Sequence, residues 1–188
     1  RGLEYMFVMM NRARHAVGVE AYAVAQQAYQ HASAYAEQRI QGRGVDSDHM
    51  DRVPIVRHPD VTRMLMEMRC RIEAMRALSL YTAAVQDYAR HHPDQKKRIY
   101  SEEVTQVLIP IVKGWSSEIG NQITSQAIQV FGGMGFIEET GAAQYYRDSR
   151  ITTIYEGTSG IQASDLVGRK LLSDGGVIIG GLIRKIRE

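Results

Sequence analysis

The chain has 188 residues, of which 44% are hydrophobic and 23% are charged, and its formal net charge at pH 7 is +2. This composition is ordinary for one well-packed globular domain. So small a net charge argues against a dedicated nucleic-acid surface, and no apolar run is long enough for a membrane span. A single cysteine, Cys70, excludes an internal disulfide framework, and its apolar-periodic surroundings predict a buried, inert thiol.

The first half of the chain predicts two long helices joined by a loop. Apolar residues recur at steps of three and four over residues 3–40, and abundant alanine favours a helix and permits close helix packing. Residues 41–59 contain glycines, prolines and aspartates without periodicity, which indicates a connecting loop. A second helix is expected to start at Pro59, a suitable first-turn residue, and to end before Pro93.

A third long helix is expected after a charged loop at residues 94–98. Ser101 is the predicted N-cap, followed by two glutamates that suit the positive end of a helix. The apolar stripe includes Trp115 and continues in phase past Pro110 to Val130, so we expect one proline-bent helix.

The last part of the chain completes the predicted bundle. A glycine turn precedes a short helical segment over Gly141–Tyr146, and a fourth helix is expected from Thr158 or Ser159 to about Leu172. The pattern predicts an all-α fold, an antiparallel up-and-down four-helix bundle over residues 1–172. Residues 173–188 are expected to form a tail that begins a further element after a double-glycine break. Because the chain begins with arginine rather than methionine, we expect it to be a piece of a longer protein.

A di-iron centre is the first functional alternative for a four-helix bundle. Such a centre needs Glu-x-x-His pairs that project inward from facing helices. The sequence contains no such pair, and none of its six histidines has metal-ligand spacing. No metal site is predicted.

The stretch from Gln129 to Gln162 is the most suggestive of chemistry. Its glycine cluster removes side chains where a backbone turns sharply or a ligand comes close. Glu156 follows a β-branched run and precedes Gly157 and Thr158, a residue suited to capping a helix. This order places the carboxylate at a helix entrance, although a lone glutamate there also fits an ordinary surface turn.

The segments YAEQR, AIQVFGGMGF and YYRDSRITTIYEGTSGIQ together resemble the carboxy-terminal helical domain of acyl-CoA dehydrogenases. The resemblance runs from about Gly2 to Leu172, and YEGT is its most specific part. It implies a flavin-dependent oxidoreductase that desaturates an acyl-CoA thioester between its α- and β-carbons. Glu156 is then the base that takes the α-proton, while the β-hydride leaves for FAD.

The resemblance also implies contacts to FAD. Arg39 matches an arginine that meets the pyrophosphate of the FAD held by the neighbouring subunit. The backbone of Gln129, Gly132 and Gly133 matches the segment that lines the adenosine side of the cofactor across the dimer. Thr158 matches a threonine that touches the subunit's own flavin.

Arg14 and Gly157 are the substrate contacts that the resemblance implies, with Arg14 near the CoA end. The implied partners are the acyl-CoA substrate, further copies in a homodimer or homotetramer formed through the bundle, and an electron-transfer flavoprotein as acceptor. The implied location is the bacterial cytoplasm. The isolated bundle is expected to be inactive, because the domains that cover flavin and substrate would precede it.

The sequence departs from the family pattern at three positions. Gly42 and Arg43 replace a phenylalanine and a glycine, and Pro59 replaces a glutamine that often contacts the partner's flavin. The longer loop before Pro59 and the tail suggest a larger subfamily with a carboxy-terminal extension. Its candidates include dehydrogenases for sulfur-containing or otherwise unusual acyl-CoAs.

Two other functions stay open from the sequence. A DNA-binding relative of the alkylation-response proteins would need a strongly positive face, to which a net charge of +2 gives little support. A dimerisation bundle that has lost catalysis is the other alternative, and the intact YEGT motif argues against it.

Overall fold

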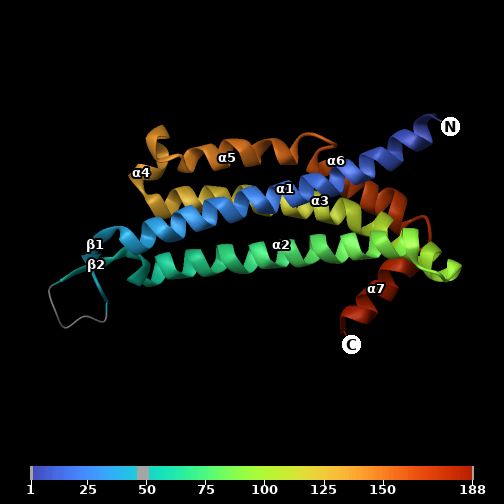
Figure 1. Cartoon of the computed structure of the whole chain (residues 1–188), viewed down its shortest axis with the longest axis horizontal. Helices are drawn as coiled ribbons and strands as arrows, with labels where there is room; N and C mark the ends of the chain where they lie inside the picture. The colour runs from blue at the N-terminus through green and yellow to red at the C-terminus, as the bar shows by residue number, and fades with distance from the viewer. Residues whose placement is uncertain (1, 46–50, 188) are drawn as a thin grey trace.

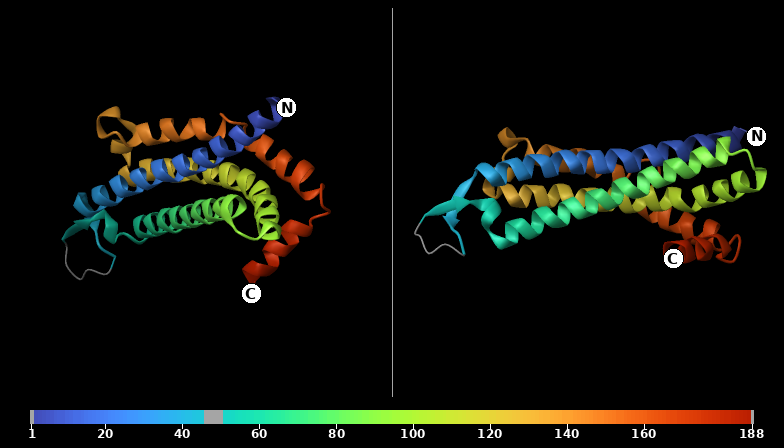
Figure 2. Two further views of the ribbon diagram at one scale, coloured as in Figure 1. Left: turned by 45° about the vertical axis from the view of Figure 1, so that its right-hand side comes forward. Right: turned by 60° about the horizontal axis from the view of Figure 1, so that its bottom comes forward.

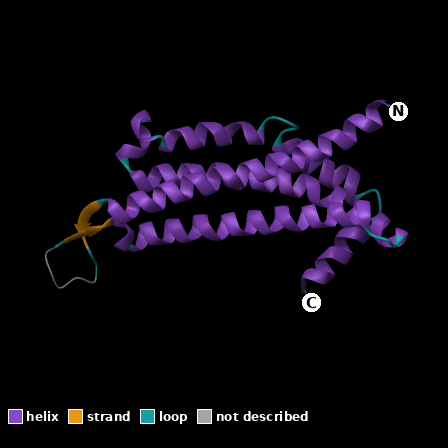
Figure 3. Ribbon diagram, viewed as in Figure 1, coloured by secondary structure: helices purple, strands orange, loops and turns teal. Residues whose placement is uncertain are grey.

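Three long helices, α1 (Gly2–Gln38), α2 (Pro59–His91) and α3 (Gln95–Phe131), form the body of the molecule (Figure 1). The computed structural model describes residues 2–45 and 51–187. Successive long helices run in opposite directions, and α3 packs against both of the others. The predicted all-α class is confirmed, as the helices that dominate Figure 3 show. None of the described helices combines the length and apolar character needed to cross a lipid bilayer.

Short helices occupy the fourth position of the predicted bundle. α5 (Ala142–Arg150) packs on α1 and α3, and α6 (Ser159–Asp165) packs on α3. A π-helical segment, Leu166–Leu171, extends α6, so the predicted fourth helix keeps its expected ends but changes its winding halfway. Figure 2 shows α5 lying along the long helices and the α6 segment continuing toward the opposite end of the bundle. The remaining short helical elements are α4 (Gly133–Phe136) and the 3-10 turns Glu138–Thr140 and Ile151–Thr153.

A two-stranded hairpin lies in the segment predicted to be a loop. β1 (Ile40–Arg43) pairs antiparallel with β2 (Arg52–Pro54), and a 3-10 turn leads from there into α2. The paired residues are Ile40 with Pro54 and Arg43 with Arg52. Burial of Val53 and Ile55 anchors the hairpin to the bundle, which gives this segment its regular structure. Residues 46–50 of the predicted loop lie outside the described residues. Pro59 is the first residue of α2, as predicted.

α3 begins earlier than predicted. The Asp94 side chain caps it by accepting a hydrogen bond from the Lys96 backbone N–H at 2.8 Å. The predicted loop at residues 94–98 and the predicted Ser101 cap are therefore wrong, because Asp94 satisfies a free N–H group at a helix start that lies before both. Pro110 lies inside α3, as predicted, and the first half of the helix is curved in Figure 2.

Two burial predictions need correction. Trp115, placed on the apolar stripe of the third helix, is 38% exposed, because the buried face of α3 passes through Val112 instead. Cys70 is exposed rather than buried. Met68 and Ile72 both face the core, and a residue two positions from each lies on the opposite side of a helix.

The carboxy-terminal tail folds back on the bundle through α7 (Val177–Arg187). The predicted break before it is present, since Gly175 and Gly176 both have positive φ. Ile178 and Leu182 of α7 pack against a small apolar cluster whose buried members are Val85, Val104 and Leu108. The tail therefore contains a further helix that touches the start of α3.

α1 and α3 approach each other most tightly at Gly18. A Cβ atom added to Gly18 would lie 2.5 Å from Val112 Cγ1 and 3.1 Å from the Val112 carbonyl oxygen. Fully buried alanines, beginning with Ala21, continue this face of α1, as the alanine-rich sequence predicted. The close approach brings two polar residues near Gly18 and Val112, Arg14 and Lys113, into the same region of the interface.

We predict that Gly18→Ala destabilises the protein by about 1–3 kcal/mol, because the new methyl group overpacks the α1–α3 interface. Gly180→Ala is the matched control, since Gly180 is also helical and has no atom within 4 Å of an added Cβ. The free energy of unfolding of the control should rise by about 0.5–1 kcal/mol, because alanine has a higher helix propensity than glycine. Urea unfolding followed by circular dichroism measures both changes, and an equal effect of the two substitutions would contradict the predicted close contact.

Candidate active site

The turn that carries Glu156 joins the 3-10 turn Ile151–Thr153 to α6. Glu156 has a φ of 55° and is the one non-glycine residue with positive φ in the described part of the chain. Gly157 follows with a φ of 91°. A left-handed conformation costs an ordinary L-residue about 1–2 kcal/mol. Such strain persists only where the surroundings fix the backbone, and it is concentrated at functional sites.

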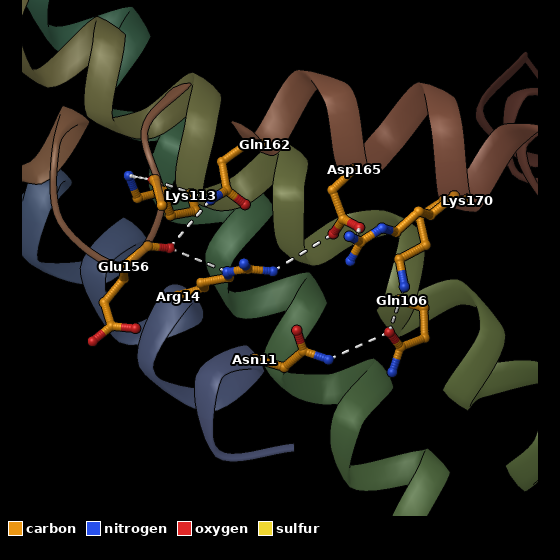
Figure 4. A network of polar contacts seen from close by, with 10 residues as sticks. Asn11, Arg14, Gln106, Lys113, Glu156, Gln162, Asp165 and Lys170 are labelled. Carbon is orange, nitrogen blue, oxygen red and sulfur yellow. Dashed lines mark hydrogen bonds and ion pairs between the residues drawn. The ribbon is translucent and has the colours of Figure 1, made fainter. Parts of the chain in front are cut away.

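Three buried side chains donate hydrogen bonds to the two carbonyl groups of this turn (Figure 4). Arg14 Nε lies 3.2 Å from the Glu156 carbonyl oxygen, and Lys113 Nζ lies 2.6 Å from the Gly157 carbonyl oxygen. Gln162 Nε2 donates to both oxygens, at 3.3 and 3.1 Å. We name Arg14, Lys113 and Gln162 the carbonyl clamp. Their exposed fractions are 8%, 0% and 1%.

The carbonyl clamp draws its members from three different helices. Arg14 comes from α1, Lys113 from α3 and Gln162 from α6. A Cβ atom added to Gly157 would lie 2.8 Å from Gln162 Nε2 and 3.3 Å from a side-chain carbon of Ile161, so the close contact requires glycine at this position. The turn is therefore fixed by long-range contacts rather than by its local sequence alone.

The two cations of the clamp interact with each other and with nearby carboxylates. Burial lowers the pKa of Lys113, and the Arg14 guanidinium lowers it further, whereas Glu118 and Glu156 oppose the change. Arg14 also forms an ion pair with Asp165 at 3.5 Å, and both side chains of that pair are nearly buried. The Asp165 carboxylate compensates the charge that Arg14 carries into the interior.

The Glu156 carboxylate points away from the carbonyl clamp in Figure 4. Among the described residues, no hydrogen bond or ion pair uses this carboxylate, and no backbone hydrogen bond uses the Glu156 N–H. The main chain of the residue is thus held while its acidic group stays available. A carboxylate in this state can accept a proton from a molecule placed beside the turn.

Residues on either side of Glu156 complete the turn. The Tyr155 hydroxyl donates a hydrogen bond to Glu20 on α1. Burial, followed by the hydrogen bond and charge of Glu20, raises the pKa of Tyr155 to about 12. Thr158 caps α6, with its Oγ1 accepting from the Ile161 N–H at 3.4 Å, as predicted. Thr158 also lines a surface depression of about 450 Å³.

The structure brings together one group of predicted site residues and separates it from another. Arg14, Glu156, Gly157 and Thr158 lie at or beside the same turn. The second group belongs to the end of the bundle where the hairpin and α4 lie, because α1 and α3 both end there (Figure 1). Its members are Arg39, Gln129, Gly132 and Gly133.

The second group is open to the surroundings. The Arg39 side chain is exposed and makes no hydrogen bond or ion pair with another described residue. Gly132 ends α3 with a φ of 61°, and an added Cβ at Gly132 or Gly133 would meet nothing within 4 Å. An uncommitted guanidinium can receive an anionic ligand. No described set of His, Cys, Asp and Glu side chains is placed to hold a metal ion.

Lys113 and Gln162 were not predicted from the sequence as site residues. Lys113 follows the buried Ile109 by four residues and precedes the buried Ser116 by three. This helical spacing could have predicted that Lys113 faces the core. A charged residue at such a position calls for a buried partner. The identity of that partner, a backbone carbonyl 44 residues further along, had no sequence signal.

Comparison with known proteins identifies relatives over nearly the whole chain. The model of the acyl-CoA dehydrogenase C-terminal domain matches residues 1–172. The chain is 53% identical, over 93% of its length, to 3-methylmercaptopropionyl-CoA dehydrogenase of Ruegeria pomeroyi, of which it covers 30%. It is 37% identical over its whole length to a broad-specificity linear acyl-CoA dehydrogenase of Mycobacterium tuberculosis, of which it covers 31%. The chain therefore spans about a third of the length of these relatives.

A solved structure of butyryl-CoA dehydrogenase from Megasphaera elsdenii has a similar fold. It superposes with a TM-score of 0.68 and 28% sequence identity, over 87% of this chain and 37% of that one.

We predict that the stabilising effect of Tyr155 disappears at high pH. Its pKa of about 12 in the folded protein exceeds the ordinary value of 10.0, so the unfolded chain loses the proton first. The contribution of the hydroxyl to the free energy of unfolding should be complete below pH 10 and should be lost as the pH approaches 12. Urea unfolding of wild type and Tyr155→Phe across this range measures it. Tyr5→Phe, at an exposed position of α1, controls for loss of a hydroxyl, and a pH-independent difference for Tyr155→Phe would contradict the prediction.

Proposed function

The chain belongs to the acyl-CoA dehydrogenase family, and we propose that it is the part of a flavin-dependent dehydrogenase that carries the catalytic base, Glu156. The reaction is the α,β-desaturation of an acyl-CoA thioester. The observation that carries the proposal is the state of Glu156: its backbone is held in a strained turn by the carbonyl clamp, while its carboxylate makes no hydrogen bond or ion pair among the described residues. A purely structural role for Glu156 would not explain why its backbone is fixed while its carboxylate is left uncommitted.

Glu156 would accept the proton from the α-carbon of the thioester. This proton is acidified by the neighbouring carbonyl, and a positioned carboxylate can remove it if negative charge on the carbonyl oxygen is stabilised. The Glu156 N–H is a donor without a backbone partner in the described part of the chain, and we propose that it serves this oxygen. FAD, when bound, would accept the hydride from the β-carbon, which leaves the Cα=Cβ double bond. The Gly157 backbone would lie against the same thioester.

The predicted cofactor residues fit FAD in their chemistry. The exposed Arg39 guanidinium suits a pyrophosphate, and the accessible backbone of Gly132 and Gly133, with exposed Gln129 beside it, suits an adenosine moiety. Thr158 lies beside Glu156 and can contribute its hydroxyl proton to a second cofactor contact. Because the two groups lie apart, we propose that they hold FAD molecules of different subunits in a homodimer or homotetramer.

The substrate is proposed to be a linear acyl-CoA, with sulfur-containing acyl groups among the candidates. This follows from the names of the two relatives, one for 3-methylmercaptopropionyl-CoA and one for linear acyl-CoAs. Arg14 Nη2 makes no hydrogen bond or ion pair with another described residue, and we propose that this atom reaches toward the CoA portion. An electron-transfer flavoprotein is the proposed acceptor, and the bacterial cytoplasm the proposed location.

We predict that Glu156→Gln in the full-length enzyme leaves flavin binding intact and slows flavin reduction by acyl-CoA about 10²–10⁴-fold, because a neutral amide cannot take up the α-proton. Anaerobic stopped-flow bleaching of the flavin with 3-methylmercaptopropionyl-CoA measures the rate. Glu103→Gln, an exposed glutamate on α3, is the matched control and should bleach like wild type. Undiminished bleaching by Glu156→Gln would remove this residue from the role of base.

Arg39→Ala in the full-length enzyme should weaken FAD retention more than it slows proton abstraction. A charge-assisted hydrogen bond is worth about 1.5–3 kcal/mol, which corresponds to an order of magnitude or more in the FAD dissociation constant. Flavin release during dilution and ultrafiltration measures the affinity. Arg69→Ala, at an exposed position of α2, is the control for loss of a surface charge. Equal FAD affinity of the two variants would show that Arg39 does not contact the cofactor.

A further inference from the structure

We propose that Lys113 is a positioning residue that holds the Glu156 turn against α3 and thereby sets the direction of the Glu156 carboxylate. The inference rests on the proposed function for its catalytic consequence. Its structural part, the control of the turn by a buried lysine, stands on the contacts of this chain alone.

The burial of Lys113 is the first observation. The side chain is 0% exposed and ranks among the largest fully buried side chains of the described residues. Removing an ammonium group from water is costly unless the group gains a compensating partner. Among the described residues, its one hydrogen-bond partner is the Gly157 carbonyl oxygen, at 2.6 Å. The turn is therefore the feature that accounts for a lysine at this place in the core.

The second observation is that the Lys113 hydrogen bond joins the turn to a different helix. The Gly157 carbonyl belongs to the peptide group directly before Thr158, the N-cap of α6. Gly157 has wide conformational freedom, so neither its own φ nor that of Glu156 is fixed by the sequence. Gln162 also donates to this carbonyl, but it belongs to α6, the helix that begins directly after the turn. Lys113 is the donor that ties this peptide group to a different element, α3.

The two cations of the carbonyl clamp hold successive peptide groups of the turn. Arg14 holds the peptide group after Glu156 to α1, and Lys113 holds the next peptide group to α3. With both planes fixed, rotation of the Glu156 backbone is restricted, and its carboxylate keeps the outward direction seen in Figure 4. The cations bind carbonyl oxygens and not the carboxylate, so the proposed base is not consumed in an ion pair.

Lys113→Met in the full-length flavoprotein tests this inference. Methionine fills a similar volume and removes the N–H donors, so the Gly157 carbonyl loses its link to α3. We expect the limiting rate of flavin reduction per bound flavin to fall about 100-fold, because a misplacement of the reacting group by about 1 Å has an effect of that size. The apparent dissociation constant of 3-methylmercaptopropionyl-CoA should change far less. An α-deuterated substrate should show an isotope effect at least as large as in wild type.

Two further variants separate positioning from stability. Ile72→Ala, at a buried position of α2 that does not contact the carbonyl clamp, should destabilise the protein without changing the rate per flavin. Lys113→Gln retains an N–H donor on a shorter side chain and should lose less rate than Lys113→Met. It also keeps a polar group in the site if the methionine variant does not fold. Rates per flavin of both Lys113 variants equal to wild type would overturn the proposal and leave Glu156 as base.

A crystal structure of Lys113→Met gives a readout that does not depend on activity. The proposal predicts that the Gly157 carbonyl turns away from α3 and that Glu156 leaves its φ of 55°. An unchanged turn would overturn the positioning role, whatever the substrate. If the wild-type flavin is not bleached by any acyl-CoA, the proposed function fails instead, and the crystal structure alone decides the role of Lys113.

Discussion

The hydrogen bonds from the carbonyl clamp to the Glu156 and Gly157 carbonyls are the interaction on which the rest of the site depends. The left-handed backbone of Glu156 costs about 1–2 kcal/mol. A hydrogen bond from a charged donor contributes about 1.5–3 kcal/mol, and Arg14 and Lys113 supply one each. The donors therefore outweigh the strain, and the turn is stable in a conformation that its own sequence does not favour.

The bundle works as the frame that brings these donors together. Arg14 and Lys113 lie on α1 and α3. These helices approach closely at Gly18, because its lack of a side chain leaves room for Val112. Alanines such as Ala21 extend the same close packing toward the hairpin end. The small residues in the core therefore set the distance between α1 and α3, and this distance determines where the Arg14 and Lys113 side chains lie. Sites built on packed helices hold their geometry more precisely than sites built on loops.

The sequence predicted the features that depend on local rules. Helical periodicity, Pro59 at a helix start and Thr158 at a helix cap all act over a few residues, and the structure confirms each of them. The position of Glu156 at a helix entrance followed from the same rules. The start of α3 was misplaced because two residues, Asp94 and Ser101, are both good caps, and periodicity does not choose between them.

The features that were missed depend on contacts between distant segments. The hairpin is anchored by burial of side chains against the bundle, which a glycine- and proline-containing segment does not reveal. Lys113 finds its partner 44 residues away in a backbone group, and backbone groups carry no residue-specific signal.

A crystal structure of the full-length flavoprotein with a non-reactive thioether analogue of an acyl-CoA would show whether Glu156 lies where a base must lie. We expect a Glu156 carboxylate oxygen within about 3.5 Å of the α-carbon, with the carbonyl clamp intact. A different carboxylate beside the α-carbon, with Glu156 directed elsewhere, would contradict it.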